Sequence, residues 1–423
     1  MTSITARADR RLIRANHKSQ RFVFVELTAP SATQARKRPP VNLAFVLDRS
    51  GSMSGGKLEL AKRAVEEAIG RLDANDRFSV VVYDEVIDVV VETTPASTEA
   101  RHNAVTRLAS VDARGSTNLG EGWLRGCEQV AAHLSADGVD RCLLLTDGLA
   151  NVGVTSPEEL AHHATELRAR GVSTTTFGVG NDFDEQLLQA MADAGGGHFY
   201  YIADAAQIRD HIASEVGETL EVVARDVELE LTVADGVQVE PISPHPAHAR
   251  GSRAIVVLGD LVADQAVDVV LRLTFPYGQV GRETGVILAV NDRDGVFGSV
   301  GANEARLTWA YADNASNDAQ PRDTEVDRAV ARMFASRARQ EALFRNRAGD
   351  YIHARWALDA TARRIRGYAG RDPELRAMVS ELEAESFIYA APMAEPDRKQ
   401  RHFASSNLAR TRTAMGAAIK RSR

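Results

Sequence analysis

The chain has little cysteine, few aromatic residues and no long apolar run, and each shortage excludes a class of protein. Its two cysteines, Cys127 and Cys142, are too few for a disulfide scaffold or a four-cysteine zinc site. Aromatic residues make up 6% of the sequence, which disfavours the stacking platforms that bind single-stranded nucleic acid. Apolar runs are strand-length, well short of the roughly 18 residues that a membrane span needs, so we expect no membrane partner. Residues 1–14 carry four arginines and no apolar core, which predicts no secretory signal and, by default, a cytoplasmic protein.

Positive charge is concentrated at the two ends of the chain. Residues 1–40 hold nine Arg or Lys against two acidic residues, and residues 397–423 hold eight against one. Because the whole chain has a net charge of -7, residues 41–396 carry -21. Basic ends could contact nucleic acid or an acidic partner, but the simpler interpretation is that they keep the chain soluble or fold back onto its acidic body.

Residues 41–222 alternate strand patterns with helix patterns. Residues 41–47 are nearly all apolar, as in a central parallel strand that is covered on both faces. Residues 58–72 place apolar side chains at helical spacing. We expect further strands at 78–83, 86–91, 141–146, 172–179 and 198–202, and further helices at 119–134, from 156, at 184–194 and at 204–219. This alternation predicts an α/β domain with a doubly wound, mostly parallel sheet of the Rossmann-like kind.

The pattern changes to strands alone over residues 223–315. Val227, Leu229 and Leu231 alternate with charged residues, which indicates a sheet with one dry face. Residues 21–28 also have a strand pattern, yet they precede the α/β region. We therefore expect the segment 1–40 to join the later strands. The α/β domain, 41–222, is then inserted into an antiparallel, β-sandwich-like domain.

The C-terminal part of the chain divides into a helical region and a tail. Residues 322–390 show three apolar stripes at helical spacing, which predict helices that share a core. No 34-residue period follows, so we exclude a tetratricopeptide-type repeat array. Residues 391–423 are polar and basic, and we expect them to be disordered.

Oxygen-bearing side chains gather at the predicted carboxyl ends of the strands, where open α/β sheets bind ligands. Asp48, Ser50 and Ser52 follow the first strand at positions i, i+2 and i+4. Thr117 lies in a loop before a helix, and Asp147 follows the buried strand at 141–146. Hydroxyl and carboxylate oxygens suit Mg²⁺ and similar hard cations, so the five side chains could converge on one ion.

These five positions resemble the metal-ion-dependent adhesion site, MIDAS, of von Willebrand factor A (VWA) domains. The resemblance covers residues 41 to about 220, and residues 38–52 and 77–84 look like the bacterial branch with a flanking β region. That branch is similar to calcium-activated chloride channel-like proteins, but the channel function is not implied because no span exists here. The resemblance implies that Ser50, Ser52 and Thr117 bind Mg²⁺ (with Mn²⁺ or Ca²⁺ as alternatives) directly. It implies that Asp48 and Asp147 bind the ion through water, or directly in another state, and hold the serines in place. It also implies a partner protein that supplies an Asp or Glu to the metal.

The leading hypothesis is therefore a non-enzymatic, metal-dependent protein-interaction module. A haloacid dehalogenase-type phosphatase would need a second Asp where Ser50 stands, and a serine hydrolase would need glycines two residues on either side of that serine. No P-loop occurs, so any ATPase is a separate chain. Two alternatives stay open: a regulatory or adaptor subunit of an ATPase or multi-protein assembly and, less favoured, nucleic-acid binding through the basic termini. The histidines show no metal-ligand spacing, and we expect His198 to be a loop residue.

Overall fold

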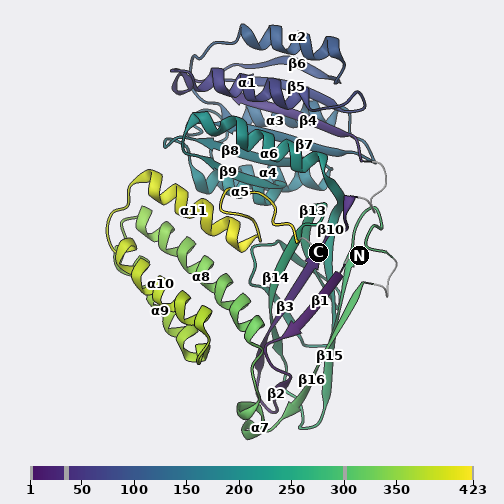
Figure 1. Cartoon of the computed structure of the whole chain (residues 1–423), viewed down its shortest axis with the longest axis vertical. Helices are drawn as coiled ribbons and strands as arrows, with labels where there is room; N and C mark the ends of the chain where they lie inside the picture. The colour runs from purple at the N-terminus through teal and green to yellow at the C-terminus, as the bar shows by residue number, and fades with distance from the viewer. Residues whose placement is uncertain (1–2, 33–37, 299–302, 422–423) are drawn as a thin grey trace. The chain divides into compact units, whose positions relative to one another are not determined.

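The computed structural model describes residues 3–32, 38–298 and 303–421 (Figure 1). The chain forms two compact units. One comprises residues 36–222 with 415–417, and the other comprises residues 1–35, 223–414 and 418–423. None of the helices in the described part of the chain combines the length and the apolar character that crossing a bilayer requires.

The first unit is built on a six-stranded sheet in the order β6-β5-β4-β7-β8-β9. The strands are β4 (Val41–Asp48), β5 (Arg77–Tyr83), β6 (Ile87–Pro95), β7 (Val139–Thr146), β8 (Ser173–Val179) and β9 (Gly196–Ile202). All neighbouring pairs are parallel except β5 with β6, which is antiparallel. Every residue of β4 and β7 is buried, as the apolar run at 41–47 predicted.

Six α-helices accompany this sheet, and Figure 1 shows them on both of its faces. They are α1 (Lys57–Gly70), α2 (Thr98–Ala109), α3 (Leu119–Ala131), α4 (Pro157–Ala169), α5 (Glu185–Gly195) and α6 (Ile208–Leu220). Ser97, Asn118, Ser156 and Asp184 accept backbone N–H groups as the N-caps of α2 to α5, so local sequence explains where these helices begin. The predicted α/β class is confirmed.

Helix α3 lies very close to the middle of the sheet, and two glycines permit the approach. A Cβ atom on Gly126 would lie 2.2 Å from Val46 Cγ2, and one on Gly122 would lie 2.4 Å from the Tyr83 ring. Contacts this short are not tolerated in a close-packed interior. The glycines therefore fix α3, and with it the loop that carries Thr117, against β4 and β5.

The second unit contains two further sheets. One has the order β1-β3-β14-β11 and the other β12-β13-β10-β15-β16-β2. Their strands are β1 (Ser3–Ala8), β2 (Leu12–Arg14), β3 (Ser19–Thr28), β10 (Val222–Val233), β11 (Gln238–Pro241), β12 (Ala247–Arg250), β13 (Arg253–Val262), β14 (Ala266–Phe275), β15 (Glu283–Asn291) and β16 (Glu304–Ala312). Strand β3 pairs with β14 along its whole length, so the early strand joins the later ones as the sequence indicated. Val25, Leu27, Leu229 and Leu231 of the two sheets share one core, and the α/β unit is inserted into this β structure.

Helices follow the last strand in the second unit. They are α7 (Asn314–Ala319), α8 (Thr324–Arg347), α9 (Tyr351–Ala369), α10 (Pro373–Tyr389) and α11 (Glu395–Ala409). The expectation of disorder from residue 391 is wrong over α11. Phe403 is buried there, and the Ser336 hydroxyl of α8 donates to the Ser405 carbonyl at 2.6 Å. Arg398 is also buried and pairs with Glu395. One of the basic residues that indicated a disordered tail is therefore part of an ion pair within the fold.

Candidate metal centre

The predicted site residues lie at one edge of the central sheet. Asp48 ends β4, and Asp147 directly follows β7. These strands are parallel neighbours in which Leu47 pairs with Leu145, so their carboxyl ends meet. Ser50 and Ser52 lie in the turn after β4, where the short 3-10 helix η2 (Gly51–Met53) forms.

Hydrogen bonds connect the turn after β4 to the loops beside it. The Ser50 and Ser52 hydroxyl oxygens are 3.0 Å apart, and the Ser52 hydroxyl donates to Asp147 Oδ1 at 2.5 Å. The Gly51 N–H donates to the Gly115 carbonyl at 3.1 Å, which joins this turn to the loop that carries Thr117. Ser50, Ser52 and Asp147 are therefore held in one polar group.

Thr117 belongs to the same group, as the surroundings of Gly148 demonstrate. A Cβ atom on Gly148 would lie 3.3 Å from Thr117 Oγ1 and 3.6 Å from Ser52 Oγ. The two hydroxyls thus border the same position, and a methyl group there would press on the Thr117 hydroxyl. Backbone bonds from Asn151 and Val152 to the Thr117 carbonyl fix this loop beside the end of β7.

Asp48 is fully buried and organises the turn rather than facing solvent. Its Oδ1 accepts the Ser50 N–H at 2.8 Å, and its Oδ2 accepts the Thr146 hydroxyl at 2.7 Å. Burial raises the pKa of the Asp48 carboxyl to about 6, although the hydrogen bonds from Thr146 and Ser50 oppose the shift and nearby Asp147 adds to it. A buried carboxylate of this kind is costly without a counter-charge, which a cation at this site would provide.

One cationic side chain, which sequence reasoning missed, contacts the site. Lys57 Nζ lies 2.5 Å from Asp147 Oδ2 and donates to the Ser52 carbonyl at 3.1 Å. Lys57 is the first residue of α1, where the helix dipole disfavours positive charge. The spacing of Lys57 from Ser52 in the sequence does not reveal this contact, because it depends on the turn at Gly55 and Gly56.

Two arginines near the site pair with other carboxylates. Arg49 lies between Asp48 and Ser50 in sequence, yet it pairs with Asp84 and with Asp88 at 2.5 Å. Arg114 pairs with Asp84 at 2.8 Å. These ion pairs hold the turn at 84–88 against the loop before Thr117, and they leave the hydroxyl groups of the site facing one another.

Comparison with known proteins assigns the first unit to a family. Residues 42–214 match the family model of the von Willebrand factor type A domain. This region is a VWA domain. Domains of this family mediate protein–protein interaction and bind a divalent metal ion at their adhesion site.

Relatives of the VWA domain occur in bacteria and animals. The chain is 32% identical over 200 residues to "Uncharacterized protein YfbK" of Escherichia coli, covering 47% of this chain and 34% of that protein. It is 29% identical over 267 residues to "Uncharacterized protein sll0103" of Synechocystis, covering 60% and 62%. It is 29% identical over 180 residues to human inter-alpha-trypsin inhibitor heavy chain H4, covering 41% and 19%. The chain thus spans about a third of YfbK and less than two thirds of sll0103.

Solved structures share the fold beyond the VWA domain. A von Willebrand factor type A protein from Catenulispora acidiphila matches with a TM-score of 0.69 at 20% identity, covering 95% of this chain and 90% of that one. The ArnB paralog VWA2 from Sulfolobus acidocaldarius matches with a TM-score of 0.57 at 17% identity, covering 93% and 100%. At these identities the likeness establishes the fold alone.

The residues of the VWA domain fit a hard divalent cation. The polar atoms that converge are all oxygens, three from hydroxyls and the rest from two carboxylates, and nitrogen or sulfur ligands are absent from the five. Such a donor set suits Mg²⁺, Mn²⁺ or Ca²⁺ better than a soft metal. The raised pKa of Asp48 and the space bounded by Thr117, Ser52 and Gly148 agree with a positive ion there.

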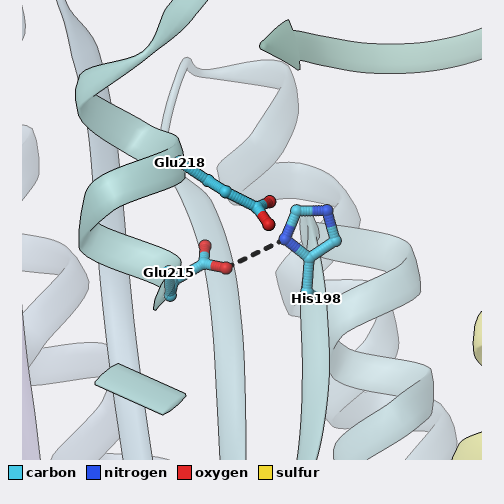
Figure 2. Close-up of side chains that lie close together, drawn as sticks. All are labelled: His198, Glu215 and Glu218. Carbon is cyan, nitrogen blue, oxygen red and sulfur yellow. Dashed lines mark hydrogen bonds and ion pairs between the residues drawn. The ribbon is translucent and has the colours of Figure 1, made fainter. Parts of the chain in front are cut away.

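A second polar cluster in the VWA domain was missed by sequence reasoning. Figure 2 shows His198 on β9 with Glu215 and Glu218 on α6, their side chains turned toward one another. Their possible ligand atoms all lie within 4.8 Å of one another. His198 lies within β9, in agreement with the strand predicted at 198–202 and against the expectation of a loop residue, and its Nδ1 is 3.0 Å from Glu215 Oε2.

The partners of Glu215 indicate that this cluster is an ion and hydrogen-bond network inside the domain. Its Oε2 also accepts the Tyr200 hydroxyl at 2.8 Å, while its Oε1 accepts Arg141 at 2.6 Å and the Thr175 hydroxyl at 2.8 Å. Both carboxylate oxygens thus have at least two partners each. The network joins α6 to β7, β8 and β9, and its sequence signal is an arginine inside an apolar strand.

Proposed function

We propose that the VWA domain holds a divalent cation, Mg²⁺ in the first place, through Asp48, Ser50, Ser52, Thr117 and Asp147, and captures a carboxylate of a partner protein there. The observation that carries the proposal is the convergence of these five oxygen-bearing side chains from three separate loops. Because hydrogen bonds already hold these side chains close together, the site needs little rearrangement when an ion enters.

The division of charge among the five residues suits capture of an anion. Ser50, Ser52 and Thr117 offer neutral hydroxyls that would contact the ion, whereas Asp48 is already engaged with the Ser50 N–H and Thr146. Neutral ligands leave a bound divalent cation with most of its positive charge. A bound cation supplies the charge that attracts an Asp or Glu side chain of the partner.

The proposal is a binding module and not an enzyme. The turn after β4 offers no second Asp for phosphoryl transfer and no nucleophile elbow around Ser50. The alternative role, an adaptor for a separate ATPase or assembly, would use surfaces other than the five oxygens. Many basic residues of the chain ends are paired with acids, for example Arg7 with Asp323 and Arg421 with Glu26 and Asp268. This pairing disfavours nucleic-acid binding through the termini.

The test compares Mn²⁺ binding by the full chain with binding by two threonine variants. Thr117→Ala removes a proposed ligand, while Thr106→Ala removes an exposed hydroxyl of α2 that bonds only its own helix. We expect Thr117→Ala to lose at least tenfold in Mn²⁺ affinity and Thr106→Ala to match the wild type. Equal affinities for all three proteins, with unchanged circular dichroism, would refute the proposed site.

A capture experiment separates the module from the adaptor. Partner proteins retained by the wild type in Mg²⁺ should be released by EDTA and should not bind Thr117→Ala. Partners that stay bound under both conditions would instead support the adaptor role.

A further inference from the structure

Lys57 reaches back from α1 to the metal site because of the residues that precede it. Gly55 and Gly56 have φ angles of +73° and +99°, a left-handed backbone that glycine adopts readily. This turn lies between Ser52 and Lys57 and returns the lysine side chain to the loop it has just left. The Lys57 ammonium then contacts both the Asp147 carboxylate and the Ser52 carbonyl.

Helix stability does not explain this lysine. The N-cap of α1 is Gly56, which offers no side-chain cap, unlike the N-caps of α2 to α5. A cation in the first turn also opposes the helix dipole. The contacts of Lys57 are instead with the residues proposed to hold the ion, so the site accounts for its position.

The charge balance of the site depends on Lys57. Asp48 and Asp147 together carry two negative charges when ionised, and the cations at Arg49 and Arg114 are paired with Asp84 and Asp88. With a divalent ion bound, the formal charges of the ion and the two aspartates would sum to zero, even though the groups proposed to contact the ion directly are neutral hydroxyls. The ammonium of Lys57 adds one positive charge beside Asp147, whose side chain is fully buried.

We propose that Lys57 determines the specificity of the site by keeping it positively charged after the cation binds. This inference rests on the proposed function and adds the residue that sets how strongly the loaded site attracts a carboxylate. The same ammonium repels the entering ion and competes with it for Asp147. Lys57 therefore weakens cation binding and strengthens carboxylate binding, two effects of opposite sign.

The expected magnitude follows from one unit charge at the border of the site. Lys57 has 31% of its side chain exposed, so solvent screens its charge in part. An ammonium in contact with Asp147 and the Ser52 carbonyl should change each affinity by about tenfold.

The experiment measures both affinities on the full-length chain. Free Mn²⁺, read by its electron paramagnetic resonance signal, gives the affinity for the cation. Relaxation of the acetate methyl protons by protein-bound Mn²⁺ gives the affinity for a carboxylate. Lys57→Gln removes the charge, Lys57→Arg keeps it, and Lys18→Gln removes the charge of an exposed lysine in the other unit.

We expect Lys57→Gln to bind Mn²⁺ about tenfold more tightly and acetate about tenfold more weakly, with Lys57→Arg and Lys18→Gln close to the wild type. A Lys57→Gln protein with both affinities unchanged, or with both moved in the same direction, would overturn the inference. Lys57→Met serves as a second neutral variant should Lys57→Gln fold poorly. A wild type that binds no Mn²⁺ would overturn the proposed function itself, which is a distinguishable result.

Discussion

Replacing Asp48 with Asn should stabilise the metal-free protein while abolishing its metal site. Asp48 is fully buried, and its pKa is raised from 3.8 to about 6, chiefly by desolvation. The folded state therefore binds this proton more tightly than the unfolded state does. The stability that the protonated carboxyl provides is present below about pH 4 and is lost as the pH rises to about 6. A shift of about two pKa units corresponds to about 3 kcal/mol at pH 7.

Asparagine can keep the local hydrogen bonds. Its Oδ1 would still accept the Ser50 N–H, and its amide could donate to Thr146 Oγ1. The Thr146 hydroxyl would then donate to the Gly148 carbonyl, which already lies 3.3 Å away. The exchange should cost no more than about 1 kcal/mol, so a net gain of about 2 kcal/mol in the free energy of unfolding is expected.

Urea unfolding in EDTA, followed by circular dichroism at pH 7 and pH 4, tests this prediction. Asp48→Asn should be more stable than the wild type at pH 7, and the difference should shrink toward zero at pH 4. Addition of Mg²⁺ at pH 7 should stabilise the wild type and leave the variant unchanged. Asp137→Asn, which replaces an exposed carboxyl in the same unit, is the control and should show neither effect. A variant less stable than the wild type at pH 7, or equally stabilised at both pH values, would refute the reasoning.

Three other substitutions test separate parts of the account. Gly148→Ala would press a methyl group against the Thr117 hydroxyl and should lower Mn²⁺ affinity about tenfold in a titration. Gly70→Ala, whose added methyl group meets no atom within 4 Å, should leave the affinity unchanged, and equal affinities for the two variants would contradict this view of the site. Gly217 lies in α6 with open space around it, so Gly217→Ala should raise the free energy of unfolding by about 0.5–1 kcal/mol. A lower free energy of unfolding would contradict the open space at this position. Glu215→Gln should lower the free energy of unfolding, measured by urea denaturation, by about 3–5 kcal/mol, because buried Arg141 loses its charged partner. A decrease of less than about 1 kcal/mol would argue against the ion network.

The sequence was informative where local pattern and topology coincide. The apolar run at 41–47 marks a central strand, and parallel neighbours bring their carboxyl ends to one sheet edge. From this alone Asp48, Ser50 and Ser52 could be expected near Asp147, and the structure places them there. The pairing of β3 with β14 followed from one strand pattern that had no partner nearby.

Features that depend on long-range contacts escaped prediction. Lys57 reaches Asp147 only through the turn at Gly55 and Gly56, and spacing along the chain does not encode that reach. An arginine inside an apolar strand indicates a buried charge, but Arg141 and Glu215 are 74 residues apart, so the sequence does not identify the partner of that charge. Helix α11 is polar in composition, and it is stabilised by the burial of Phe403 and by contacts with α8 that the composition does not reveal.

The central claim is that oxygens from three loops share one hard cation. An anomalous-scattering map from crystals of the full chain grown with Mn²⁺ tests it most directly. The account predicts a strong peak among the hydroxyls of Ser50, Ser52 and Thr117, with Asp48 and Asp147 beside it. A saturated crystal with no peak at this sheet edge, or with its ion between His198 and Glu215 instead, would contradict the account.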